Sequence, residues 1–123
     1  MTTPADLPAT MLELRSTLTD DGTVTLAVRE ADLPPVGDDQ VLVRVEAAPI
    51  NPSDLGMLFA MGDISAAAAA ESDGNPAVAL PVSAAAVTAQ TGRLGKPMPV
   101  GNEGGGTVVA CLLYTSPSPR DLR

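Results

Sequence analysis

Three segments of the chain alternate between apolar and polar residues with a period of two, and they constrain the fold more than any other feature. These segments cover residues 11–18, 23–29 and 40–47. Successive side chains of a β-strand point to opposite faces, so this period is typical of strands with one buried face. The first two segments are separated by a turn that contains Asp21-Gly22, and an Asp-Gly pair predicts a β-hairpin. We therefore expect antiparallel β structure.

The pattern changes after Ile50. Asn51-Pro52-Ser53-Asp54 predicts a turn that leads into a short helix, because Asn51 or Ser53 can cap a helix and proline is tolerated in a first turn. The residues that follow place Leu55, Leu58 and Phe59 on one helical face. The alanine tract at 65–70 is interpreted as a surface excursion, a solvated loop or helix with no functional role.

The remaining segments predict one more helix and one more strand. Residues 71–76 are expected to form a loop, and residues 82–93 have a helical composition that ends at Gly95 and Pro97. A last β run is expected to begin near Met98 and to continue through Ala110.

Composition excludes several classes of function. The net charge is −8, so the chain lacks the basic surface that binds phosphate backbones or anionic lipid, and we expect no nucleic-acid partner. No apolar run approaches the roughly 20 residues needed to cross a bilayer, and residues 1–9 lack the basic start of a signal peptide. We therefore expect a cytoplasmic protein with no membrane contact. The length of 123 residues predicts one domain at most.

The chain contains no histidine and one cysteine, Cys111. It therefore cannot form a Ser–His or Cys–His pair, a zinc site built from histidine and cysteine, or a disulfide within one chain. The one phenylalanine, one tyrosine and absence of tryptophan predict a thin core, since aromatic side chains supply the largest burial per residue.

Three segments, 40–50, 51–54 and 99–109, resemble in this order the N-terminal GroES-like domain of the medium-chain dehydrogenase/reductase superfamily. The resemblance implies a mainly β fold, a partial GroES-like β-barrel with short helices, over residues 1–110. It also implies that the Rossmann domain of the family is absent from this chain.

The resemblance is to the zinc-independent branch of that superfamily. In the zinc-containing alcohol dehydrogenases, a Cys-His-x-Asp turn and a Gly-His-Glu turn each supply a metal ligand, and the matching positions here are Asn51 and Asn102. An amide is a poor zinc ligand beside thiolate or imidazole, so we expect no metal site. The pattern is similar to the quinone oxidoreductases and enone reductases.

For this branch, the resemblance implies hydride transfer from NADPH to a quinone or an α,β-unsaturated carbonyl, in an enzyme that is a homo-oligomer. Asn51 would lie near the nicotinamide and donate a hydrogen bond to the acceptor carbonyl, which makes it both a cofactor-binding and a catalytic residue. Ser53 matches a proton-relay hydroxyl, or serves as a cap. Asp54, Asn102 and Glu103 would hold the geometry of the two turns.

Three alternatives accompany this interpretation. Asn51–Asp54 alone is typical of a helix-capping turn. The glycines between 101 and 106 suggest a dinucleotide loop, but their spacing is not G-x-G-x-x-G and a β run follows them, so we interpret them as a glycine-rich strand or bulge. The alternative function, from a different class, is a small non-enzymatic β interaction module.

Residues 111–123 depart from the family pattern and resemble the in-frame translation of a transposase sequencing adaptor. We expect them to be a non-native tail, so Cys111 and Tyr114 are not candidates for catalysis. On this interpretation the chain is a fragment that ends before the rest of the barrel, and alone it would be inactive.

Overall fold

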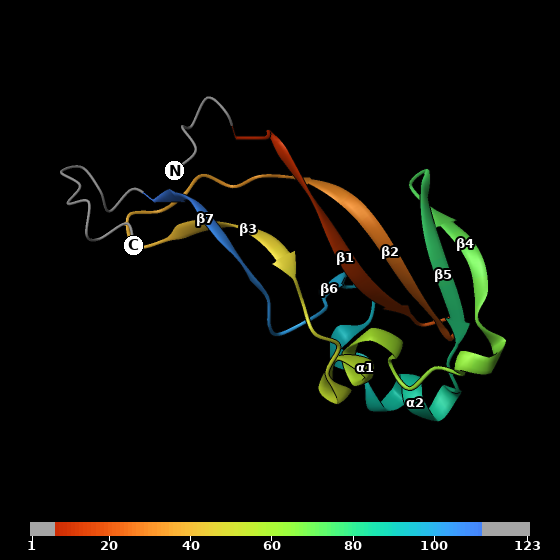
Figure 1. Cartoon of the computed structure of the whole chain (residues 1–123). Coiled ribbons are helices and arrows are strands. Elements are labelled where there is room, and N and C mark those ends of the chain that lie inside the picture. The colour runs from red at the N-terminus through yellow and green to blue at the C-terminus, as the bar shows by residue number, and fades with distance from the viewer. Residues whose placement is uncertain (1–6, 112–123) are drawn as a thin grey trace. The chain divides into compact units, whose positions relative to one another are not determined.

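The computed structural model describes residues 7–111, which separate into two compact units (Figure 1). Among these residues the first unit comprises 7–10, 32–49 and 103–111, and the second comprises 11–31 and 50–102. In chain order the strands and helices are β1 (Thr10–Thr19), β2 (Thr23–Asp32), β3 (Val41–Ala47), α1 (Pro52–Phe59), η2 (Ile64–Ala66), β4 (Ala68–Ser72), β5 (Asn75–Pro81), α2 (Ala84–Ala89), η3 (Thr91–Arg93), β6 (Met98–Pro99) and β7 (Gly105–Cys111).

The second unit is built on a five-stranded sheet with the order β4-β5-β2-β1-β6. β2 pairs antiparallel with β5, and β1 pairs antiparallel with β6. The predicted hairpin between β1 and β2 is confirmed, and Gly22 in its turn has a φ of 84°, which only glycine adopts at no steric cost. The turn is closed by the Gly22 N–H, which donates to the Thr19 carbonyl at 3.2 Å.

The first unit contains a two-stranded antiparallel sheet of β3 and β7. Its register shifts twice, between Leu42 and Val43 and between Val45 and Ala47. The glycine-rich segment therefore forms a strand that starts at Gly105, as expected. The predicted mainly β class with antiparallel sheets is confirmed, whereas the described strands form two sheets that are not closed into a barrel.

Only part of the alanine tract is the loop or helix that we expected: Ser65 and Ala66 lie in the 3₁₀ helix η2, whereas Ala68–Ala70 lie in β4. β4 pairs with β5 from Ala68 opposite Ala79 to Ser72 opposite Asn75. The intervening Asp73 and Gly74 both have positive φ angles, 51° and 80°, which is the geometry of a two-residue hairpin turn. Alanine favours helix intrinsically, but pairing with β5 outweighs that weak preference.

Three other predicted segments differ in detail from the structure. The loop expected at 71–76 is reduced to Asp73 and Gly74, between β4 and β5. The last β run is wrong as a single strand, because β6 pairs with β1 in one sheet and β7 pairs with β3 in the other. Gly101, with a φ of 95°, lies between these two strands. The predicted helix at 82–93 is confirmed as α2 and η3, but Val82 precedes the helix and is buried in the core.

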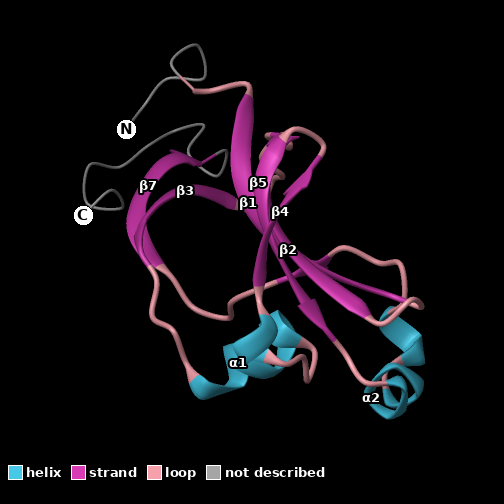
Figure 2. Cartoon of the chain, turned by 90° about the vertical axis from the view of Figure 1, so that its right-hand side faces the viewer, coloured by secondary structure: helices cyan, strands magenta, loops and turns pink. Residues whose placement is uncertain are grey.

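The core of the second unit lies where α1 and α2 meet the sheet. Both helices lie at the same end of the five-stranded sheet (Figures 1 and 2). Leu18 and Val24 from the first hairpin and Leu80 from β5 are almost wholly buried there. The buried cluster in the described residues consists of Leu18, Val24, Ala60, Leu80, Val82 and Ala86, so it contains no aromatic side chain, and Phe59 only packs against it.

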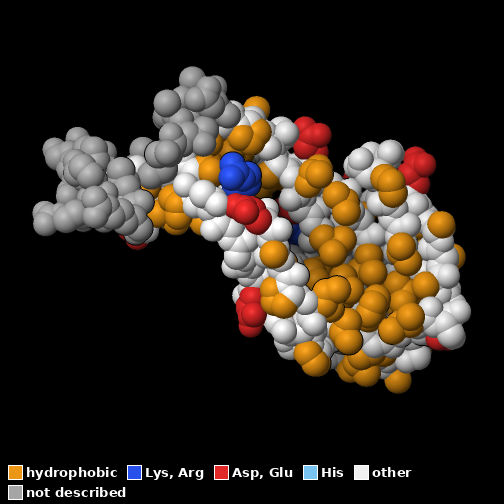
Figure 3. Space-filling view, in the orientation of Figure 1, with side chains coloured by type: hydrophobic (Ala, Val, Ile, Leu, Met, Phe, Trp, Pro, Cys, Tyr) orange, Lys and Arg blue, Asp and Glu red, His pale blue; other side chains and the backbone are white. Residues whose placement is uncertain are grey.

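An apolar groove lies next to this core and is lined by residues of β1, β2, β5 and α1. Leu26, which packs against the core, also lines the groove, whose volume is about 310 Å³. Its lining residues are Leu14, Leu26, Val28, Leu58, Pro76, Ala77 and Val78. Figure 3 shows apolar side chains gathered over the second unit on the side that faces the viewer.

Candidate functional site

The turn at Asn51–Asp54 starts α1 as the sequence predicts. Asn51 is the N-cap residue with an extended backbone, and Pro52 occupies the first turn of the helix. The Asn51 N–H donates to the Asp54 side chain (Oδ2) at 2.8 Å, and the Asp54 N–H donates to the Asn51 carbonyl at 2.9 Å. Asn51 is therefore the capping position, and Ser53 lies exposed within the helix.

Asp54 also binds the second segment that carries the family resemblance. The Asn102 side-chain amide (Nδ2) donates to Asp54 Oδ1 at 3.1 Å, although the two residues are 48 positions apart. Asp54 is only 5% exposed, and each of its two carboxylate oxygens accepts a hydrogen bond from another residue of the chain. We call this cluster of Asn51, Asp54 and Asn102 the Asp54 junction.

The structure thus brings together three of the five predicted site residues within the second unit. Ser53 lies beside them in sequence, on the first turn of α1, and is exposed to solvent. Glu103 belongs to the first unit and is also exposed. The catalytic and cofactor-binding roles of Asn51 and Ser53 stay predictions.

The chemistry available at the Asp54 junction is that of amides and one carboxylate. The backbone N–H of Asn51 donates to the Asp54 side chain and the Asn51 carbonyl accepts from the Asp54 N–H, while the carboxamide of Asn51 lies at the N-cap of α1. A carboxamide can both donate and accept a hydrogen bond. In residues 7–111 no group of three or more His, Cys, Asp or Glu side chains is placed to hold a metal ion.

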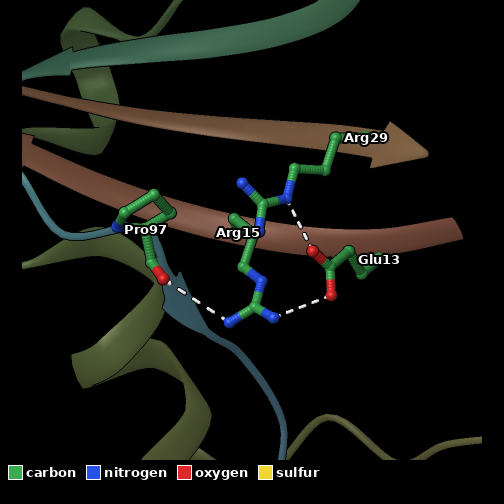
Figure 4. A network of polar contacts seen from close by, with 4 residues as sticks. All are labelled: Glu13, Arg15, Arg29 and Pro97. Atoms are coloured by element: carbon green, nitrogen blue, oxygen red, sulfur yellow. Dashed lines mark hydrogen bonds and ion pairs between the residues drawn. The ribbon is translucent and has the colours of Figure 1, made fainter. Parts of the chain in front are cut away.

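A second polar cluster, which the sequence analysis did not single out, lies on β1 and β2 (Figure 4). The two oxygens of Glu13 accept from Arg15 Nη2 at 2.7 Å and from Arg29 Nε at 2.6 Å. Arg15 also donates to the Pro97 carbonyl at 3.4 Å. The hydrogen bond from Arg15, followed by that from Arg29, lowers the pKa of Glu13 to about 2.

The signal for this cluster was present in the alternation of the strands. Glu13 and Arg15 are polar positions of the same period-two segment, so they share one face of β1. What the alternation does not show is that Arg29 of β2 lies across from Glu13. The two arginines also line a hollow of about 350 Å³, together with Glu71 and Asp73 of the β4–β5 hairpin.

The lowered pKa of Glu13 predicts a pH dependence of stability. Because the folded pKa is about 2 and the ordinary value is 4.5, the contribution of Glu13 is fully present above pH 4.5. It is lost as the pH falls toward 2. We expect Glu13→Gln to lower stability to urea at pH 7 and to reduce the decline of stability between pH 4.5 and pH 2.

Glu30→Gln is the matched control, because Glu30 is an exposed carboxylate on β2 that forms no ion pair among the described residues. The comparison requires urea midpoints at several pH values for the wild type and both variants. Equal pH profiles for Glu13→Gln and the wild type would show that the cluster contributes nothing to folding.

A third cationic group ties α1 to β1 from inside the second unit. Arg93 donates to the Met57 carbonyl at 3.1 Å and to Ser16 Oγ at 2.9 Å. Ser16 Oγ in turn donates to the Leu58 carbonyl at 2.9 Å. Burial lowers the pKa of Arg93 from its ordinary value, yet the group has no carboxylate partner among the described residues. We assign it a structural role.

None of the helices described in the structure is both long enough and apolar enough to span a bilayer. The chain matches no protein-family model and no curated protein.

Proposed function

We propose that this chain is the substrate-side domain of a cytoplasmic, zinc-independent oxidoreductase that uses NADPH to reduce quinones or α,β-unsaturated carbonyls. The observation that supports the proposal is the Asp54 junction. Two segments that separately resemble the medium-chain reductases, 51–54 and 99–109, meet there through one buried carboxylate. On this proposal the two sheets represent a partial GroES-like barrel.

Asn51 and Ser53 have distinct roles in the proposed reaction. When bound, NADPH supplies the hydride. The Asn51 carboxamide donates a hydrogen bond to the acceptor carbonyl, where negative charge develops as the hydride is accepted. The exposed hydroxyl of Ser53 passes a proton toward the reduced product. Asp54 and Asn102 act as positioning residues, because they hold the backbone of Asn51 in place.

The described residues fit only the acceptor side of such a site. Dinucleotide phosphates bind where a glycine-rich turn leads from a strand into a helix N-terminus. Here Gly101 lies in the connection between β6 and β7, and the glycines that follow it lead into a strand. The phosphates of NADPH would therefore be held by a part of the protein outside residues 7–111.

The decisive experiment uses the gene for this chain, sequenced through and beyond the codons for residues 111–123. We expect it to encode a downstream βαβ unit with a G-x-G-x-x-G turn, and the purified product to oxidise NADPH with 1,4-benzoquinone or an enone. The 123-residue chain should show no oxidation above a heat-treated control. In the longer protein, Asn51→Ala should lower kcat by about 100-fold, as expected for loss of one donor to a developing oxyanion.

Asn75→Ala is the matched control, since Asn75 lies in the β4–β5 hairpin and has no part in the proposed site. A kcat for Asn51→Ala equal to that of this control would remove Asn51 from the mechanism. A natural stop codon soon after Ala110, with no NADPH oxidation, would instead favour the non-enzymatic interaction module. The apolar groove on the open sheet is the observation that supports this second candidate.

A further inference from the structure

β4 is an edge strand that lacks most of the features that normally prevent pairing with another chain, and Glu71 is its one charged residue. It is the outermost strand of the five-stranded sheet, and the structure describes no partner on its outer side. Edge strands are commonly protected by proline, by charged side chains, especially lysine, by bulges, or by being very short. The β4 sequence is Ala-Ala-Ala-Glu-Ser, and its five pairs with β5 follow one regular register.

The other described strand edges are protected in these ways. β6, at the opposite edge of the same sheet, consists of only two residues, one of them Pro99. The β3–β7 sheet has two register shifts, and β3 carries Arg44 and Glu46. Only β4, among the strands in residues 7–111, combines an open edge, a regular ladder and mainly alanine side chains.

The β4–β5 hairpin determines which backbone groups face outward. In a hairpin with a two-residue turn, the residues that flank the turn exchange hydrogen bonds, and every second pair along the ladder does the same. Ser72 and Asn75 flank the turn, so Ser72, Ala70 and Ala68 bond inward to β5. The backbone N–H and carbonyl groups of Ala69 and Glu71 therefore point away from the sheet.

We propose that β4 pairs antiparallel with β4 of a second copy of this chain, with Ala69 opposite Glu71 of the partner subunit. In this register all four outward-facing residues, two from each copy, exchange backbone hydrogen bonds, and Ala70 lies opposite its own equivalent on the twofold axis. The pairing joins the two five-stranded sheets edge to edge. This inference is independent of the proposed enzymatic function.

Glu71 selects this register over its two neighbours. A shift that places Glu71 opposite its own equivalent brings like charges together, which is unfavourable for directly opposite residues of a sheet. The reverse shift places Ala69 opposite its equivalent and moves Glu71 beyond the start of β4 at Ala68, where no strand is present to receive it. The register with Ala69 opposite Glu71 avoids both losses.

A second copy is the occupant that matches this edge. After a twofold rotation, the outward N–H and carbonyl groups of one β4 meet the matching groups of the other. The short alanine side chains allow this approach, and each Glu71 then lies opposite Ala69 and not opposite the other Glu71. The net charge of −8 means that two copies repel each other, so association should strengthen as salt screens that repulsion. A basic peptide would show the opposite salt dependence.

The first test measures the dissociation constant of the dimer of the full 123-residue chain by sedimentation equilibrium at several salt concentrations. A reducing agent is included so that Cys111 forms no intermolecular disulfide. Ala69→Pro removes an outward N–H without removing any inward donor, and should raise the dissociation constant at least about tenfold, because two hydrogen bonds are lost per dimer. Ala69→Ser keeps the N–H and should leave the constant unchanged.

The second test reads the register through charge. Ala69→Lys places a cation opposite Glu71 of the partner subunit and should tighten the dimer by about 2- to 30-fold, since two opposite-charge pairs form. Ala69→Glu should weaken it by a similar factor, and Glu71→Lys added to that variant should restore association. Thr88→Lys, an exposed site on α2, controls for the change in net charge.

Either of two results would overturn the proposal. A chain that stays monomeric at high protein and salt concentrations forms no such dimer. If Ala69→Lys lowers the dissociation constant no more than Thr88→Lys does, the dimer pairs through another surface. The same conclusion follows if Ala69→Glu leaves the dissociation constant unchanged. Far-ultraviolet circular dichroism confirms that each variant is folded, and the lysine and glutamate variants decide the question even if the proline variant unfolds.

Discussion

Replacing Gly106 with alanine is expected to destabilise the β3–β7 sheet by about 3 kcal/mol, at the upper end of the usual cost of overpacking. A β-carbon at Gly106 would collide with the carbonyl oxygen of Arg44, and would lie 2.8 Å from the Arg44 carbonyl carbon and 3.0 Å from the Val45 Cα. All three are backbone atoms of β3, so relief of the clash requires the strands to separate.

Gly105→Ala is the control for this prediction, because it lies next in the same strand and an added β-carbon there meets no atom within 4 Å. We expect its effect to be within about 0.5 kcal/mol, as for most surface substitutions. Hydrogen exchange of the amides in β3 and β7 measures the loss of the sheet directly, even if the two units unfold separately. Equal protection in the two variants would contradict the predicted close approach of the strands.

Replacing Asp54 with alanine is expected to lower the stability of the second unit by about 2–3 kcal/mol. The change removes two hydrogen bonds to a charged acceptor, and bonds of this kind contribute about 1.5–3 kcal/mol each, with incomplete additivity. It leaves the Asn51 N–H and the Asn102 amide without their acceptor. Urea unfolding and hydrogen exchange of the α1 amides would measure the loss.

Two further variants separate the junction from the helix cap. Asn102→Ala removes one donor and should cost about 1 kcal/mol, and the double variant with Asp54→Ala should show a coupling energy of roughly 1 kcal/mol. Ser53→Ala is the local control, since Ser53 is exposed on the same turn. A coupling energy of zero would mean that Asp54 acts only as a cap for α1.

The local elements could be predicted because the residues that specify them are close together in the sequence. The β1–β2 hairpin needs only alternation and the Asp21-Gly22 turn, and both are read within about 20 residues. The start of α1 depends on Asn51, Pro52 and Asp54, which lie within four positions of one another. The same holds for α2, whose N-cap Ser83 accepts from the Ala86 N–H.

The misassigned elements are those whose structure depends on a distant partner. The alanines at 68–70 have no intrinsic preference for a strand, and they form β4 by pairing with β5, which also pairs with β2. Met98 and Val108 look alike as parts of one β run. They belong to different sheets, because the segment with Met98 pairs with β1 and the segment with Val108 pairs with β3.

The sequence by itself determined the mainly β class, the first hairpin, the capped turn at Asn51 and the exclusion of histidine chemistry. The first three follow from the side-chain period and the turn residues, which are properties of a few neighbouring residues. The last follows from composition, which does not depend on residue order. The tertiary structure alone decided that Asn102 binds Asp54, that Arg29 binds Glu13 and that β4 forms an open edge. Each depends on backbone segments far apart in the chain being packed side by side, and no local pattern encodes which distant segment that will be.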